Sequence, residues 1–110
     1  AAYPLAPTAT FVPPAAPVQA LMAMHGTLGI QRAVVVQPTG YGFDNRCTLD
    51  AVAALGGHGC AVVVVDASTD EATLHRLHAA GARGVRFMML PGGVLPWDAL
   101  EPVAARIQPL

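Results

Sequence analysis

The chain has 110 residues, of which 54% are hydrophobic and 12% are charged, and its formal net charge is −1. Soluble domains usually carry about 25% charged residues, so this composition excludes a disordered chain, and the charge excludes a basic surface for nucleic acid as the main feature. The longest apolar run, residues 61–65, ends at Asp66 and is far shorter than the roughly 18 residues that a membrane span needs.

Two cysteines are too few for a disulfide framework, so Cys47 and Cys60 are interpreted as buried free thiols of a reducing compartment, which places the protein in the cytoplasm. The N-terminus has no basic segment followed by an apolar core, and therefore no secretory signal is expected. The chain begins without methionine and stops just after a helical pattern, so both ends look cut rather than native.

The N-terminal segment is rich in proline, with five of the ten prolines within residues 1–17. Proline fixes φ and removes a hydrogen-bond donor, which predicts an extended leader over residues 1–16. Pro17 suits the first turn of a helix that Gly29 ends, and His25 is expected to be buried within its apolar stripe.

Three apolar segments follow, at residues 33–37, 60–65 and 84–90, and the first two show no alternation of polar and apolar residues. Strands of this kind are covered on both faces, which is typical of a parallel sheet with helices. Helices are predicted between and after them, over residues 45–55, 68–80 and 97–107.

Local signals set the expected ends of these helices. Asp44 is predicted to cap the first, and Ser68 with Glu71 forms a potential capping box for the second. Pro102 predicts a kink or a late start in the last helix. Residues 17–110 thus read as one helix followed by three strand-helix units, an α/β fold with parallel strands. A closed (β/α)₈ barrel needs roughly 250 residues, so the chain is either a small open sheet or a slice of a barrel.

Ligands in parallel α/β folds bind at the carboxyl ends of the strands. Arg86 is the strongest signal there, because a guanidinium inside an apolar strand needs an anion, either Asp66 or a substrate carboxylate. Arg46 lies in the first turn of a helix, where a cation opposes the macrodipole. It either helps to hold an anion at that helix end or extends into solvent.

Two further patterns give weaker signals. Residues 40–45 imitate a dinucleotide-binding fingerprint, with Asp66 about 20 residues on, but the third glycine is replaced by Asn45. A small nucleotide-binding α/β module therefore stays an alternative. His75 and His78 share a helix face but lack a third metal ligand nearby, so they are expected to be solvated.

Several segments together resemble the amidohydrolase-2 family, particularly its branch of dicarboxylate lactonases. The resemblance covers about residues 3–107. The segments that carry it are Phe11-Val12-Pro13-Pro14, Gln37-Pro38-Thr39-Gly40-Tyr41-Gly42-Phe43-Asp44-Asn45-Arg46, Leu77-His78-Ala79-Ala80-Gly81, Gly84-Val85-Arg86-Phe87 and Trp97-Asp98-Ala99-Leu100.

The resemblance implies a partial (β/α)₈ barrel, about strands two to four, in a hydrolase that opens a lactone or similar carbonyl of a small carboxylated compound. It implies that Arg86 binds a substrate carboxylate and that Thr39 offers it a hydroxyl. Asn45 and Arg46 belong to the same loop motif and are assigned to substrate binding. Phe11 matches a pocket residue that is tyrosine in some members, but it lacks the hydroxyl.

The sequence also departs from the family pattern. Met88 stands where asparagine is common, and Gly92 where the lactonase has a second arginine. The family's metal-binding and catalytic histidines and its aspartate would lie outside residues 1–110, so no catalytic residue is assigned and the cofactor stays unknown, with a divalent metal such as zinc possible in a full-length parent. A decarboxylase of the same superfamily is the alternative enzyme. Neither a nucleic-acid nor a membrane partner is expected, and the sequence does not determine the oligomeric state.

Overall fold

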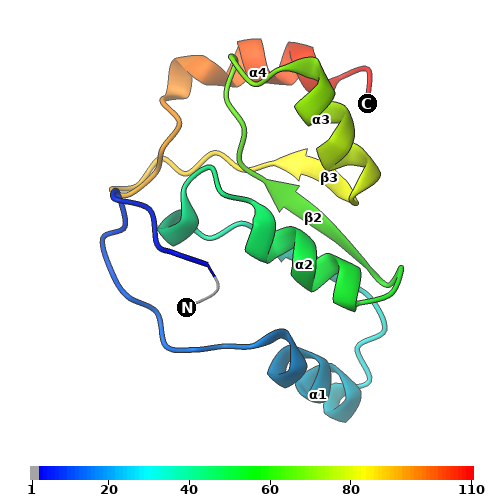
Figure 1. Ribbon diagram of the computed structural model, residues 1–110. Coiled ribbons are helices and arrows are strands. Elements are labelled where there is room, and N and C mark those ends of the chain that lie inside the picture. The colour runs from blue at the N-terminus through cyan, green and yellow to red at the C-terminus, as the bar shows by residue number, and fades with distance from the viewer. Residues whose placement is uncertain (1–2) are drawn as a thin grey trace.

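The computed structural model describes residues 3–110 as three strands and four α-helices in alternating order after the first helix (Figure 1). The strands form one parallel sheet with the order β1-β2-β3. This arrangement confirms the predicted α/β class. The elements are α1 (Val18–Leu28), β1 (Ala33–Val36), α2 (Arg46–Ala54), β2 (Gly59–Val63), α3 (Glu71–Ala79), β3 (Ala82–Val85) and α4 (Leu100–Ile107), with short 3₁₀ turns at Thr39–Tyr41 and Trp97–Ala99.

The hydrophobic core lies between one face of the sheet and helices α2, α3 and α4, and Figure 1 shows α2 alongside β2 and α3 beside β3. Alternate residues of β2 and its extension supply the sheet side of this core, and each helix contributes one buried side chain. The buried members are Val52, Ala61, Val63, Val65, Leu74, Ala82 and Val103.

The opposite face of the sheet is open. Val34 and Val36 of β1 are 59% and 46% exposed, and Val62 and Gly84 lie beside each other on this face. The apolar β1 sequence predicted cover on both faces, whereas residues 3–110 cover only one. In a (β/α)₈ barrel the second face is the interior, which the facing strands fill.

The helix starts differ from the expected caps. Helix α3 is capped by Asp70, whose side chain accepts a hydrogen bond of 2.7 Å from the Thr73 amide, so the predicted Ser68–Glu71 capping box is wrong. Ser68 instead donates to Asp66. The α2 cap position is held by Asn45 rather than by the predicted Asp44. The Asn45 side chain forms no capping hydrogen bond, because it is bound to the Val64 backbone.

Strand β3 is shorter than predicted, ending at Val85 rather than at residue 90. The Arg86 amide still donates to the Val63 carbonyl, but the chain then turns, and a Cβ on Gly93 would lie 2.0 Å from the Met88 carbonyl oxygen. This close approach folds residues 88–93 into a tight loop. Pro102 lies in the first turn of α4, which is the expected late start rather than a kink.

Helix α1 lies against the rest of the fold more loosely than expected. It ends at Gly29, whose φ of 70° confirms the predicted C-cap, but none of its residues is buried and His25 is half-buried. Cys47 and Cys60 are free and also only half-buried. No helix within residues 3–110 is long and apolar enough to cross a membrane.

The leader runs back over the loops at the carboxyl end of the sheet, as Figure 1 shows. The Ala6 amide donates to the Gly40 carbonyl at 2.8 Å, and the Leu5 side chain lies against Gly40. Further along, Thr10 lies against Gly92. The leader therefore connects the loop after β1 with the loop after β3.

Candidate functional site

A small cleft opens at the carboxyl ends of the strands, where the loops after β1 and β3 meet. Only one of its lining residues is charged. The lining residues are Gln37, Thr39, Gly42, Val64, Arg86, Met88, Gly93, Val94 and Leu95. Thr39 and Arg86 therefore line the same cleft, as the sequence predicted.

Arg86 is half-buried and is held by neutral acceptors. Its Nη1 atom donates a hydrogen bond of 2.7 Å to the Gln37 backbone carbonyl, and its Nη2 atom lies 3.3 Å from the sulfur of Met88. Within residues 3–110 no carboxylate forms an ion pair with this guanidinium. The cleft thus carries a positive charge that its own side chains do not neutralise.

The alternative that Arg86 pairs with Asp66 is wrong. The Asp66 Oδ1 atom accepts hydrogen bonds from the amide and hydroxyl of Ser68 and from the Thr69 hydroxyl. These bonds lower the pKa of Asp66, the Ser68 hydroxyl contributing most. The aspartate therefore closes its own turn after β2.

Gln37 organises the wall of the cleft and was not identified from the sequence as a site residue. Its side chain is fully buried and donates to the carbonyls of Gly42 and Asp44, at 3.1 and 2.8 Å. Its Oε1 atom accepts a hydrogen bond from Thr48 of α2. The available signal was an amide side chain at the end of an apolar strand, directly before proline.

Asn45 connects the same loop to β2. Its side-chain amide donates hydrogen bonds to the carbonyls of Val64, at 2.8 Å, and Phe43, at 3.2 Å. Its Oδ1 atom accepts a hydrogen bond of 2.9 Å from the Val64 amide. The residue is 8% exposed and is absent from the cleft wall. Its polar atoms are already engaged by backbone, so Asn45 holds the loop in place.

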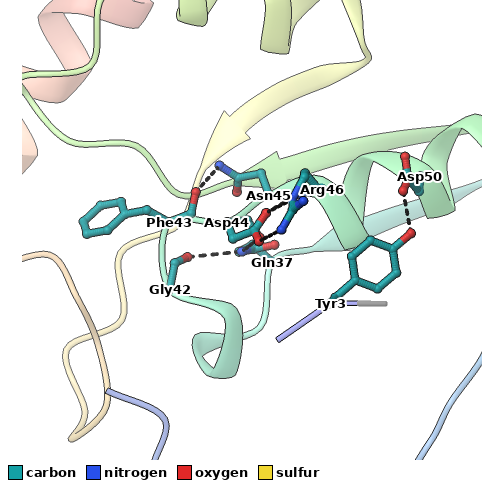
Figure 2. A network of polar contacts seen from close by, with 8 residues as sticks. All are labelled: Tyr3, Gln37, Gly42, Phe43, Asp44, Asn45, Arg46 and Asp50. Atoms are coloured by element: carbon teal, nitrogen blue, oxygen red, sulfur yellow. Dashed lines mark hydrogen bonds and ion pairs between the residues drawn. The ribbon is translucent and has the colours of Figure 1, made fainter. Parts of the chain in front are cut away.

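The structure does not bring Arg46 and Phe11 into the cleft. Arg46 forms a two-point ion pair with Asp44, with Nε–Oδ1 and Nη2–Oδ2 distances of 2.9 and 2.6 Å, and its side chain is 66% exposed (Figure 2). This pair lowers the pKa of Asp44 to about 2. Phe11 is 54% exposed and lies outside the residues that line the cleft.

The glycine-rich segment 40–45 is not shaped like a phosphate-binding loop. Thr39–Tyr41 form a 3₁₀ turn, Leu5 lies against Gly40, and a Cβ on Gly42 would lie 3.2 Å from Ala6. Leader residues therefore occupy the surface that a diphosphate would need, which argues against the nucleotide-binding alternative.

The described part of the chain does not gather a metal site. Residues 3–110 contain no group of three or more histidine, cysteine, aspartate or glutamate side chains placed to hold an ion. His75 lies 3.8 Å from Glu71 on the exposed face of α3, with side chains 61% and 84% exposed.

Parallel strands with helices on one face and a cationic cleft at their carboxyl ends are the arrangement expected of a segment of a (β/α)₈ barrel. The family model described as Amidohydrolase matches residues 1–110. The chain belongs to this amidohydrolase family, as the sequence motifs indicated.

Curated relatives share this sequence over much of its length. It is 41% identical to a 2-pyrone-4,6-dicarboxylate hydrolase of Comamonas testosteroni, over 98% of this chain and 36% of that protein. It is 42% identical to a D-galactarolactone isomerase of Agrobacterium fabrum, over 72% of this chain and 27% of the relative. It is 36% identical to a 4-sulfomuconolactone hydrolase of Hydrogenophaga intermedia, over 81% and 29%. The chain thus spans about a third of the length of these relatives.

Solved structures agree with this assignment. An Agrobacterium tumefaciens protein solved in its apo form superposes with a TM-score of 0.89 at 37% identity, over 97% of this chain and 40% of that one. A probable 2-pyrone-4,6-dicarboxylic acid hydrolase of Acinetobacter baumannii, solved with citric acid bound, gives 0.77 at 27% identity, over 93% and 41%.

Proposed function

We propose that this chain forms the carboxylate-binding part of a lactonase-like amidohydrolase that acts on a small carboxylated compound. The observation that carries the proposal is Arg86, a half-buried guanidinium at the carboxyl end of the sheet whose acceptors are a carbonyl and a thioether. Neither acceptor carries a charge. A carboxylate entering the cleft would supply the missing negative charge and form charge-assisted hydrogen bonds.

Apolar side chains of the cleft are proposed to contact the rest of such a substrate. Val94 and Leu95 present apolar surface beside Arg86, which suits the body of a small ring compound. Thr39 is proposed to donate its hydroxyl to the bound carboxylate. The relatives include hydrolases of a pyrone dicarboxylate and of a sulfomuconolactone, which supports an anionic lactone as the substrate class.

The proposed site contains fewer residues than the sequence predicted. Arg86 and Thr39 contact the substrate, and Asn45 positions the loop that carries Thr39. Arg46 and Phe11 take no part, because their side chains lie outside the cleft.

Residues 1–110 alone are proposed to bind but not to hydrolyse, because no side chain in the cleft is a general base next to a place for water. The open face that exposes Val34 and Val36 is expected to bind a hydrophobic dye and to promote self-association. We propose that the protein lies in the cytoplasm, because Cys47 and Cys60 are free thiols.

Calorimetric titration with 2-pyrone-4,6-dicarboxylate and with citrate tests the proposal. Replacing Arg86 by methionine should weaken binding by roughly 30-fold or more, since losing a buried charge-assisted contact costs about 2–5 kcal/mol. Arg83→Met is the matched control, because this exposed arginine of β3 donates to the carbonyls of His78 and Ala82 outside the cleft. Equal binding by a folded Arg86→Met variant, or no binding by the unaltered chain, would overturn the proposal. Lactone turnover by the purified monomer would overturn the view that these residues lack the catalytic base.

A further inference from the structure

The sulfur of Met88 occupies one edge of the Arg86 guanidinium at an Nη2–Sδ distance of 3.3 Å. We infer that Met88 is a specificity-determining residue, which holds this edge with an acceptor weak enough for a carboxylate to displace. The inference deepens the proposed function and rests on it.

The two ends of the guanidinium are held unequally. Nη1 donates 2.7 Å to the Gln37 backbone carbonyl, which is a strong and fixed acceptor. The thioether at Nη2 is a weak acceptor on a flexible side chain. A carboxylate oxygen forms a much stronger, charge-assisted bond with the same N–H group. The carbonyl therefore fixes where the guanidinium lies, while the sulfur leaves its second edge available.

The fold fixes the backbone that presents this sulfur. Met88 follows Arg86 by two residues, and both line the cleft. The Gly93 backbone packs directly on the Met88 carbonyl, where a Cβ would come within 2.0 Å. Residue 88 is thus held next to the guanidinium whatever its side chain is, so the chemistry of that side chain decides how strongly Nη2 is engaged before substrate arrives.

A graded series at residue 88 tests this inference. Met88→Leu removes the acceptor at similar size, Met88→Gln introduces a strong neutral acceptor, and Met88→Glu introduces a charge that pairs with Arg86. Calorimetric Kd values for citrate and 2-pyrone-4,6-dicarboxylate should stay within about threefold for leucine, rise about tenfold for glutamine and rise further for glutamate. Met89→Gln is the control, because its exposed neighbouring side chain is absent from the cleft wall.

Each outcome separates the two proposals. Equal Kd values for the leucine and glutamine variants, whether unchanged from the unaltered chain or raised by the same factor, would overturn the role of Met88 while leaving the Arg86 site intact. No binding by the unaltered chain, or binding that survives Arg86→Met, would overturn the site itself. Thermal melting checks that every variant is folded, and if the glutamine variant does not fold, the leucine and glutamate pair makes the same comparison.

Discussion

The Nη1 atom of Arg86 donates a 2.7 Å hydrogen bond to the backbone carbonyl of Gln37, 49 residues earlier in the chain. The Gln37 side chain forms hydrogen bonds away from the cleft, with Thr48 of α2 and with the carbonyls of the following loop. One residue therefore connects the cation of the cleft to helix α2. The stability of the loop and the position of Arg86 should consequently respond together when this connection is altered.

The Gln37–Thr48 hydrogen bond should be visible as an energetic coupling. Both side chains are buried, with 0% and 2% exposure, so removing one leaves the other without its partner. Gln37→Leu and Thr48→Val should each lower the free energy of unfolding by about 1–3 kcal/mol. The double variant should lose less than the sum, because the second change removes a group that is already unpaired. Urea unfolding measures all four proteins, and strictly additive losses would contradict the coupling.

Asn45 should matter for stability through both of its bonds to Val64. Asn45→Ala removes a donor and an acceptor from a buried backbone pair, so unfolding should become easier by about 2–4 kcal/mol. Asn45→Asp keeps the acceptor but turns a charged oxygen toward the Val64 carbonyl at neutral pH, so it should be at least as destabilising as alanine. Chemical denaturation gives the comparison. Full stability of the aspartate variant would show that the donated bond contributes nothing.

Two glycines should respond in opposite directions to alanine. Gly93→Ala would place a Cβ 2.0 Å from a backbone oxygen, so the loop after β3 must move, with loss of stability and weaker citrate binding. Gly26→Ala meets nothing within 4 Å on helix α1 and should stabilise the protein by about 0.5–1 kcal/mol. Melting temperatures of both variants are compared with that of the unaltered chain. A Gly93→Ala protein with an unchanged melting temperature and unchanged citrate binding would contradict the packing of Gly93 on Met88.

The Asp44–Arg46 pair should make stability depend on pH at the acid end. The Arg46 guanidinium lowers the pKa of Asp44 from 3.8 to about 2. A lowered pKa means that the folded state favours the charged carboxylate, so this contribution is complete above about pH 4 and is lost as the pH falls toward 2. The stability advantage over Asp44→Asn should shrink across that window, and added salt should reduce it because the pair is exposed. Arg46→Gln should reduce this pH dependence without abolishing it, because the Arg46 backbone amide also donates to Asp44 Oδ1 at 3.2 Å, and an unchanged dependence in that variant would point to another cause.

The sequence by itself determined the order of elements, the parallel sheet and the Gly29 cap. These features depend on local signals, namely apolar runs that need cover, glycine where φ is positive, and the spacing of strand starts. The family also followed from sequence, because its motifs are short continuous segments such as residues 37–46. Arg86 stood out for a local reason as well, since a charge inside an apolar strand needs a partner wherever it folds.

Only the tertiary structure decided which groups contact Arg86. Asp66 follows the neighbouring strand and was a possible ion-pair partner by sequence. Its carboxylate instead accepts a hydrogen bond from Ser68 in the following turn, and Arg86 contacts Gln37 and Met88. Asn45 likewise serves Val64, 19 residues away, rather than a ligand. Side-chain hydrogen bonds of this kind depend on how strands are placed beside each other, to within a few tenths of an ångström. Periodicity and composition specify which face a residue takes, but not which of several acceptors lies within reach.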